Sequence, residues 1–288
     1  MSDSDHDHLF DQGLLHDLEV LNALANRRRV LRWIAAAGAA SLAPLFGCSS
    51  SANDGGAGAA GTGGTGTASG GAASGGAASG GDCTTIPEET GGPYPGDGTN
   101  GPNALSTSGI VRSDITSSFG TLSGTAEGVP LTVKLKIVNA AGNCESLAGY
   151  AVYIWHCDRD GKYSMYTAAD QNYLRGVQET GADGTVTFTS IYPACYSGRW
   201  PHIHFEVYKS LAEASAAGTP IATSQLAMPD AQNKQVFAVS GYEASINNYA
   251  AVSLSSDMVF SDGASTETPT MTGNITDGYV AALTVGVG

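Results

Sequence analysis

Residues 202–208 read His-Ile-His-Phe-Glu-Val-Tyr, and the alternation of apolar and polar side chains in this stretch is typical of a β-strand. Successive side chains of a strand point to opposite faces, so His202 and His204 share one face with Glu206 and Tyr208. The two histidines then lie roughly 6.5–7 Å apart along the strand, close enough for both rings to bind one metal ion. The strand therefore predicts a candidate metal site on its polar face.

The small number of histidines favours this interpretation. Three of the six histidines lie near the N-terminus, and only His156, His202 and His204 follow residue 82. The alternative is a pair of strand histidines that face solvent, since short motifs also occur by chance. We favour the metal site, because the pair uses two of the three histidines in the part of the chain that we expect to fold.

Further segments alternate in the same way, and Asp-Gly turn dipeptides such as Asp160-Gly161 separate several of them. The expected strands are Leu131–Val138, Tyr150–Cys157, Thr185–Thr189, His202–Tyr208, Ile221–Ala227, Gln235–Val239 and Tyr279–Val287. A short stretch at 211–217 is the only helical candidate. Residues 83–288 are therefore predicted to form one all-β domain, a sandwich of antiparallel strands.

The N-terminal 48 residues have the pattern of an export signal. Residues 26–32 read Asn-Arg-Arg-Arg-Val-Leu-Arg, which resembles a twin-arginine signal, and an apolar stretch of about 15 residues follows. That stretch is too short for a comfortable membrane span. Leu45-Phe46-Gly47-Cys48 resembles a bacterial lipobox, although a plain signal peptide with a chance cysteine is the alternative. We expect an exported protein at the periplasmic or cell-surface face, anchored to a bacterial membrane only through a lipid on Cys48.

Residues 49–82 consist almost entirely of Gly, Ala, Ser and Thr, with the repeat Gly-Gly-Ala-Ala-Ser at 70–74 and again at 75–79. Such a segment cannot bury a core, so we expect a flexible linker. Its root-mean-square reach is roughly 30–35 Å, enough to hold a domain clear of a bilayer.

Charge excludes one class of partner. The chain has a formal net charge of −14, and after residue 48 there are 21 acidic against 9 basic residues. A surface of this sign repels nucleic acid, so we expect no nucleic-acid partner.

The chain has five cysteines. With Cys48 assigned to lipid, Cys83, Cys144, Cys157 and Cys195 remain for an oxidising compartment, and four cysteines allow three pairings. We favour Cys157–Cys195 with Cys83–Cys144, because Cys157 and Cys195 flank the two segments placed at the metal. Free buried thiols are the alternative.

Four separated segments, in order, resemble the intradiol ring-cleavage dioxygenases, the family of protocatechuate 3,4-dioxygenase and catechol 1,2-dioxygenase. They are Glu89-Thr-Gly-Gly-Pro-Tyr94, Trp155-His-Cys-Asp-Arg-Asp-Gly-Lys-Tyr163, the run from Tyr196 through Arg199 to His204, and Ser224-Gln225. The resemblance spans most of residues 83–288 and implies a β-sandwich enzyme.

The resemblance also implies a cofactor, a non-haem Fe(III) ion bound by Tyr163, Tyr196, His202 and His204. An anionic phenolate oxygen suits this hard, highly charged cation, and the cation lowers the pKa of the bound tyrosine far below its free value. Composition alone could not select these two tyrosines, because the chain has twelve.

The activity that the resemblance implies is cleavage of the ring of a catechol-type aromatic diol with O₂, giving a muconate-type diacid. Tyr196 is expected to accept a substrate proton, and Arg199 to stabilise developing negative charge. A tethered β-sandwich binding module with a vestigial or non-catalytic metal site remains the alternative. A cupin or a copper–zinc superoxide dismutase would need more histidines, or a carboxylate at a defined spacing after the His-x-His motif.

Matching to the family extends the expected site. Gln225 corresponds to a substrate-orienting position, and Thr90, Gly92, Pro93 and Tyr94 to a loop at the substrate entrance. His156 corresponds to a position that does not bind the metal, so we expect it to be packed and hydrogen-bonded.

The chain departs from the family pattern between Tyr196 and His202, which only five residues separate. The well-studied family members carry a longer insertion there. We therefore expect a more open site.

Overall fold

The structure, a computed structural model, describes residues 83–216 and 218–288. The expected signal peptide, Cys48 and the linker lie outside these residues. The strands are β1 (Pro130–Asn139), β2 (Glu145–Ser146), β3 (Ala151–Trp155), β4 (Arg175–Glu179), β5 (Thr185–Ile191), β6 (His202–Tyr208), β7 (Ala222–Ala227), β8 (Thr270–Asn274) and β9 (Gly278–Val287). The helices are α2 (Leu211–Ser215), α3 (Asp230–Val236), α4 (Glu243–Ala250) and the 3-10 turn η1 (Phe260–Asp262).

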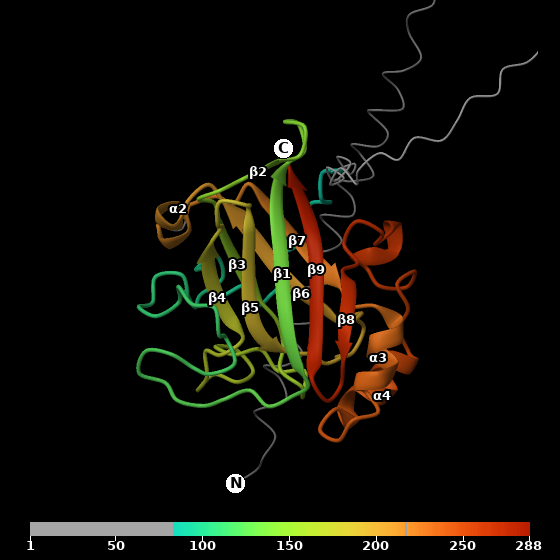
Figure 1. Ribbon diagram of the computed structural model, residues 1–288. Helices are drawn as coiled ribbons and strands as arrows, with labels where there is room; N and C mark the ends of the chain where they lie inside the picture. Colours follow the sequence, from blue (N-terminus) through green and yellow to red (C-terminus); the bar gives the residue numbers. More distant parts are fainter. Residues whose placement is uncertain (1–82, 217) are drawn as a thin grey trace, which may run out of the picture. The chain divides into compact units, whose positions relative to one another are not determined.

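Two sheets form the predicted sandwich. One has the order β2-β1-β9-β8 with β5 also paired to β1, and the other has the order β4-β3-β6-β7. In Figure 1, β1 and β9 run side by side in the front layer, with β3, β6 and β7 behind them. All strand pairs are antiparallel except β1 and β9, which are parallel. The predicted antiparallel sandwich is confirmed apart from this pair. A long connection separates β7 from β8, and a short hairpin then joins β8 to β9, so β9 arrives beside β1 in the same direction.

The core between the sheets follows from the alternation read in the sequence. Every second residue of β1 points inward, and Val133 and Leu135 are fully buried against Ile203 and Phe205 of β6. Burying each of these side chains contributes about 1.5–3 kcal/mol relative to exposure. The apolar face of residues 202–208 therefore anchors β6 in the core, which leaves its polar face for another role.

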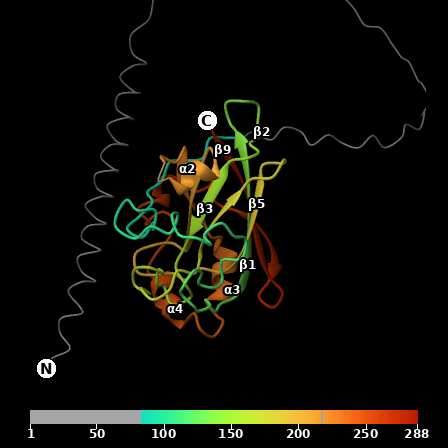
Figure 2. The ribbon, with the colours of Figure 1, turned by 90° about the vertical axis from the view of Figure 1, so that its left-hand side faces the viewer.

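A second apolar layer covers the outer face of the four-stranded sheet. Leu105, Ile110 and Phe119, from the long segment before β1, pack with Tyr153 and Trp155 of β3. Figure 2 shows this segment, in teal and green, on the side of β3 opposite β1. The polar face of β6 is consequently buried too, since His202, His204 and Glu206 are each at most 4 % exposed.

The helical content differs from expectation. The candidate at 211–217 is confirmed as α2, whereas the strand expected at Gln235–Val239 is wrong, because its first two residues end α3. Pro229 precedes α3, and Lys234 pairs with Asp230 one turn earlier at 2.7 Å. Asn233 and Val236 are the buried residues of α3, and their spacing of three is helical. The expected strand, Gln235–Val239, begins after Asn233, so this spacing was not visible within it. Helix α4 and strands β2, β4 and β8 were also not expected.

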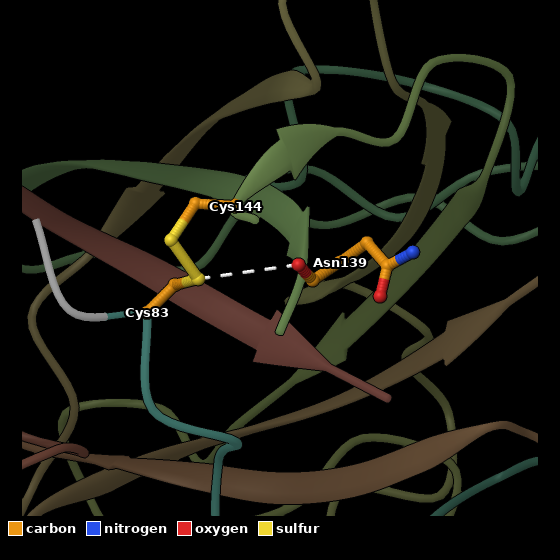
Figure 3. Close-up of a disulfide and its surroundings, with 3 residues drawn as sticks. All are labelled: Cys83, Asn139 and Cys144. Atoms are coloured by element: carbon orange, nitrogen blue, oxygen red, sulfur yellow. Dashed lines mark hydrogen bonds between the residues drawn. A yellow bond between two sulfur atoms is a disulfide. The ribbon is translucent and has the colours of Figure 1, made fainter. Parts of the chain in front are cut away.

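The two expected disulfides have opposite outcomes. Cys83–Cys144 is formed and ties the start of the described chain to the turn after β1 (Figure 3). The Cys83 sulfur also lies 3.9 Å from the Asn139 carbonyl oxygen, the dashed contact in Figure 3.

The expected Cys157–Cys195 disulfide is wrong, because both residues are free, buried thiols. Each sulfur is directed at a backbone carbonyl instead: Cys157 Sγ lies 3.7 Å from Ala194 O, and Cys195 Sγ 3.4 Å from Arg199 O. The fact that Cys157 and Cys195 flank the segments expected to bind the metal was therefore not a sufficient reason to predict a disulfide between them.

Helices in the described part of the chain are short, and none has the length and apolar character needed to cross a bilayer.

Candidate metal centre

Four expected ligands come from three parts of the fold. His202 and His204 lie on the polar face of β6, Tyr163 lies in the connection between β3 and β4, and Tyr196 lies in the connection between β5 and β6. We call these four residues the Tyr/His cluster. The strand fixes the two histidines, so the position of each tyrosine depends on its loop.

The turn before Tyr163 is held by Asp158. Its Oδ1 accepts hydrogen bonds from the backbone N–H groups of Asp160 and Lys162, both at 2.9 Å. Gly161 in this turn has φ +81°, and a Cβ there would lie 3.2 Å from Tyr196 Cβ. The Asp-Gly dipeptide thus allows the two tyrosine loops to pack closely.

The four terminal atoms of the cluster converge. His202 Nε2 lies 3.1 Å from His204 Nε2, 3.2 Å from Tyr196 Oη and 3.3 Å from Tyr163 Oη. The two phenolic oxygens are 3.5 Å apart. The structure thus brings together all four residues that the family resemblance marks as ligands.

Donor chemistry and spacing fit one bound cation. His202 Nδ1 lies 2.5 Å from the Trp200 carbonyl and must donate to it, which leaves Nε2 with its lone pair toward the cluster. A single lone pair cannot satisfy three neighbours at hydrogen-bond distance. Ligands about 2.1 Å from a metal ion are spaced roughly 3.0–3.4 Å apart in common geometries, close to the separations here.

Tyrosine is essential to this interpretation. In the part of the chain that the structure describes, no three His, Cys, Asp or Glu residues are grouped so that they could hold a metal ion. A centre built only from these four residue types, as in many zinc sites, is therefore not offered by residues 83–216 and 218–288.

Burial sets the protonation of the cluster. It lowers the pKa of His202 and His204 well below the usual value, and the charge of Arg199 adds to the effect on both. Burial also raises the pKa of Tyr163 and Tyr196 above that of a free tyrosine. Without a cation the cluster is therefore two neutral imidazoles and two neutral phenols, and the phenolate form needs a positive charge beside it.

The loop expected at the substrate entrance reaches the cluster. Gly92 has φ +70°, and a Cβ at this position would lie 3.3 Å from His204 Cε1. Thr90 Oγ1 accepts from Gly92 N at 3.0 Å, and the Tyr94 ring lies 4.9 Å from the Tyr163 ring. The Pro93 carbonyl accepts a hydrogen bond from Asn100. The loop therefore borders the Tyr/His cluster.

Arg199 and Gln225 also lie at the cluster. Arg199 Nη1 is 3.5 Å from His202 Nε2, and Nη2 donates to Gln225 Oε1 at 2.7 Å. Gln225 Nε2 donates in turn to the Thr90 carbonyl at 2.8 Å. These contacts connect two residues expected to act on substrate with the entrance loop.

His156 lies outside the cluster, as expected. Its Nδ1 is 2.8 Å from the Cys157 carbonyl and its Nε2 is 2.7 Å from Ser190 Oγ. Both ring nitrogens are thus occupied, and the prediction of a packed, hydrogen-bonded histidine is confirmed.

Three residues of the surroundings were missed. Trp155 stacks on His204, and Asp257 pairs with Arg199. Arg175 is buried and donates to the carbonyls of Tyr94 and Pro95 on one side and of Ser164 on the other. Only Trp155 had a signal, since it opens one of the family-like segments. The other two become visible when the strands are paired and the loops are placed.

Comparison with known proteins gives an independent view of the chain. Residues 101–217 match the family described as Dioxygenase. The intradiol ring-cleavage dioxygenase from Tetranychus urticae has a similar structure with a TM-score of 0.56 at 24% identity, over 71% of this chain and 95% of that one. Catechol 1,2-dioxygenase from Pseudomonas arvilla C-1 aligns with a TM-score of 0.43 at 16% identity, over 65% of this chain and 60% of that one. No curated protein matches the sequence.

Proposed function

We propose that this chain is an intradiol ring-cleavage dioxygenase and binds non-haem Fe(III) through Tyr163, Tyr196, His202 and His204; the family match over residues 101–217 and the similar fold support the proposal. Its reaction is then the opening of a catechol-type diol with O₂ to a muconate-type diacid. One observation carries the proposal: four donor atoms from three segments converge at 3.1–3.5 Å. When bound, the ferric ion supplies a Lewis acid for the two diol oxygens and prepares the ring for reaction with O₂.

Tyr196 is the better placed of the two tyrosines to move a proton. Tyr163 is only 2 % exposed, whereas Tyr196 is half-buried and followed by the exposed residues Ser197 and Gly198. The Tyr196 side of the cluster is therefore closer to solvent than the Tyr163 side. In this role Tyr196 Oη accepts one of the two protons that the diol loses on binding.

Arg199 stabilises negative charge on the substrate. Its guanidinium is buried, so its electrostatic effect is stronger than it would be in water. Nη1 faces the cluster, and Gln225 keeps Nη2 occupied. Gln225 in turn holds the entrance loop at Thr90, which keeps that loop beside the reacting groups.

Aromatic side chains provide a surface for a flat ring. Tyr94 is half-buried and packs on both Tyr163 and Tyr166, with ring centroids 4.9 and 5.1 Å apart. Such a surface suits an aromatic diol, because offset and edge-to-face contacts are favourable.

Metal analysis and oxygen uptake test the proposal. The purified domain 83–288 should contain close to one iron per chain and show a visible phenolate-to-Fe(III) band. It should consume O₂ with catechol or protocatechuate. Tyr163→Phe and His202→Ala should lose the band and the uptake, while Tyr150→Phe, on a half-buried tyrosine outside the cluster, should keep both.

Two outcomes would contradict the proposal. A colourless, iron-free protein would favour the tethered binding module. Iron without uptake on any diol would leave a metal-binding protein that lacks this activity.

Export and anchoring are a separate proposal that rests on the sequence of residues 1–82. The twin-arginine route carries folded proteins, so iron could enter the domain before export, and the Cys83–Cys144 disulfide suits an oxidising compartment. Replacing Arg27 and Arg28 by Lys should leave the precursor inside the cell. Cys48→Ser should release the exported protein from the membrane fraction, and unchanged fractionation would contradict the lipid anchor.

A further inference from the structure

We infer that Asp257 is a positioning residue for Arg199, one that holds the guanidinium so that a single amino group faces the Tyr/His cluster. The inference rests on the function proposed above. Asp257 lies between α4 and η1, beyond the residues 101–217 that match the dioxygenase family.

The Asp257 carboxylate is fully buried and accepts four N–H groups. Oδ2 accepts from Arg199 Nε at 3.0 Å and from the Trp200 backbone N–H at 2.6 Å. Oδ1 accepts from the backbone N–H groups of Val259 and Phe260 at 2.8 and 3.1 Å. Both oxygens are thus fixed, so the carboxylate is a rigid acceptor for Arg199.

The planar guanidinium of Arg199 is consequently held by hydrogen bonds at two of its nitrogen atoms. Nε is bound to Asp257, and Nη2 donates to Gln225 Oε1 at 2.7 Å. Because the guanidinium is rigid, these two contacts determine the direction of Nη1. Nη1 lies 3.5 Å from His202 Nε2 and therefore faces the centre of the cluster.

Within the described residues, Asp257 forms no hydrogen bond with any of the four expected ligands, and its only side-chain hydrogen-bond partner is Arg199. In addition to burial, its charge raises the pKa of Tyr196, but its control over the direction of Nη1 acts through Arg199. Without the carboxylate, Arg199 keeps Gln225 as its side-chain acceptor but loses the contact at Nε. A displacement of about 1 Å in a catalytic group can cost on the order of 100-fold in rate. Removing Asp257 should therefore lower kcat while leaving the iron site intact.

Two substitutions test this role. Asp257→Asn keeps the size but places an N–H group against Arg199 Nε or the turn amides. Asp257→Ser keeps a hydroxyl oxygen that can accept from the turn amides, so it provides a folded variant if Asp257→Asn fails to fold. The matched control is Glu127→Gln, which removes the exposed partner of Arg159, 2.6 Å away.

We expect roughly 10- to 100-fold lower kcat in the Asp257 variants, with iron content and the visible band as in the unmodified protein. Glu127→Gln should have the same kcat, iron content and visible band as the unmodified protein. In an Arg199→Gln background, Asp257→Ser should change kcat by less than about threefold, because its effect requires the guanidinium.

Three results would overturn the inference: an unchanged kcat, loss of iron from the Asp257 variants, or an equal fall in kcat with and without Arg199. The last would mean that Asp257 acts only by holding its own turn. If instead the iron-loaded unmodified protein consumes no O₂, the proposed function itself fails, which is a different result from any of these.

Discussion

Trp155 and His204 lie opposite each other on the adjacent strands β3 and β6, and their rings stack with centroids 4.9 Å apart and planes 5° apart. Tyr153 stacks on the far side of Trp155 at 4.9 Å. The stack covers one face of the His204 ring and leaves its edge free to point at the cluster. The orientation of this expected ligand therefore depends on strand pairing as well as on its own strand.

Removing the stack should weaken metal binding. We expect Trp155→Leu to lower iron affinity roughly tenfold, because supports behind a metal ligand typically matter by 10–100-fold. Trp155→Phe keeps an aromatic face, and the buried Trp155 Nε1 has no hydrogen-bond partner among the described residues, so this variant should hold iron nearly as well. Competition with a ferric chelator measures both, and equal affinity in Trp155→Leu would contradict the role of the stack.

Gly92→Ala should impair catalysis at the entrance loop. The backbone at this position has φ +70°, and the added Cβ would meet His204 at 3.3 Å. Gly149→Ala is the matched control, since Gly149 has φ +79° and nothing within 4 Å of the added atom. Both should lose about 1 kcal/mol of unfolding free energy. Only Gly92→Ala should raise KM or lower kcat several-fold, and equal kinetics in the two variants would place the loop away from substrate.

Acid should destabilise the fold through His156. Burial lowers the pKa of His156 to about 4, whereas the unfolded chain has the ordinary value near 6.5. The folded state thus binds fewer protons than the unfolded state between these values, so stability is fully present above about pH 6.5 and is lost as pH falls toward 4. The shift corresponds to about 3 kcal/mol.

His156→Asn removes this titration. Urea unfolding at pH 7 and at pH 4.5 should show the stability advantage of the unmodified protein over His156→Asn shrinking by about 2–3 kcal/mol at the lower pH. A difference that does not depend on pH would contradict a buried neutral His156.

Loss of the Cys83–Cys144 disulfide should lower stability without affecting the iron site. The bond joins residues 61 positions apart, and a closed loop of that length is worth up to about 4 kcal/mol in the chain-entropy model. The double variant Cys83→Ser/Cys144→Ser should unfold at lower denaturant concentration and keep its visible band. Replacing the free thiols Cys157 and Cys195 by Ser should leave the protein as sensitive to a reductant as the unmodified protein, because the Cys83–Cys144 disulfide is still present.

Much of the fold could be predicted from local alternation. β1, β3, β5, β6, β7 and β9 each overlap an expected strand, because one face of each is packed in the core and the period of two is visible in the sequence. Helix α3 was missed, because its apolar positions fall in a window too short to separate helical from strand spacing. The parallel pairing of β1 and β9 depends on how the chain returns after α4 and β8, which no local pattern contains.

By itself, the sequence determined the all-β class, the strand that carries His202 and His204, the sign of the surface charge, and the family resemblance that singled out Tyr163 and Tyr196. These follow from periodicity, composition and short motifs, which are local properties. Only the tertiary structure decided that four donor atoms meet, that Cys157 and Cys195 remain thiols, and that Trp155, Arg175 and Asp257 support the site. Those contacts join residues far apart in the chain, and their geometry exists only when both sheets and their loops are packed together.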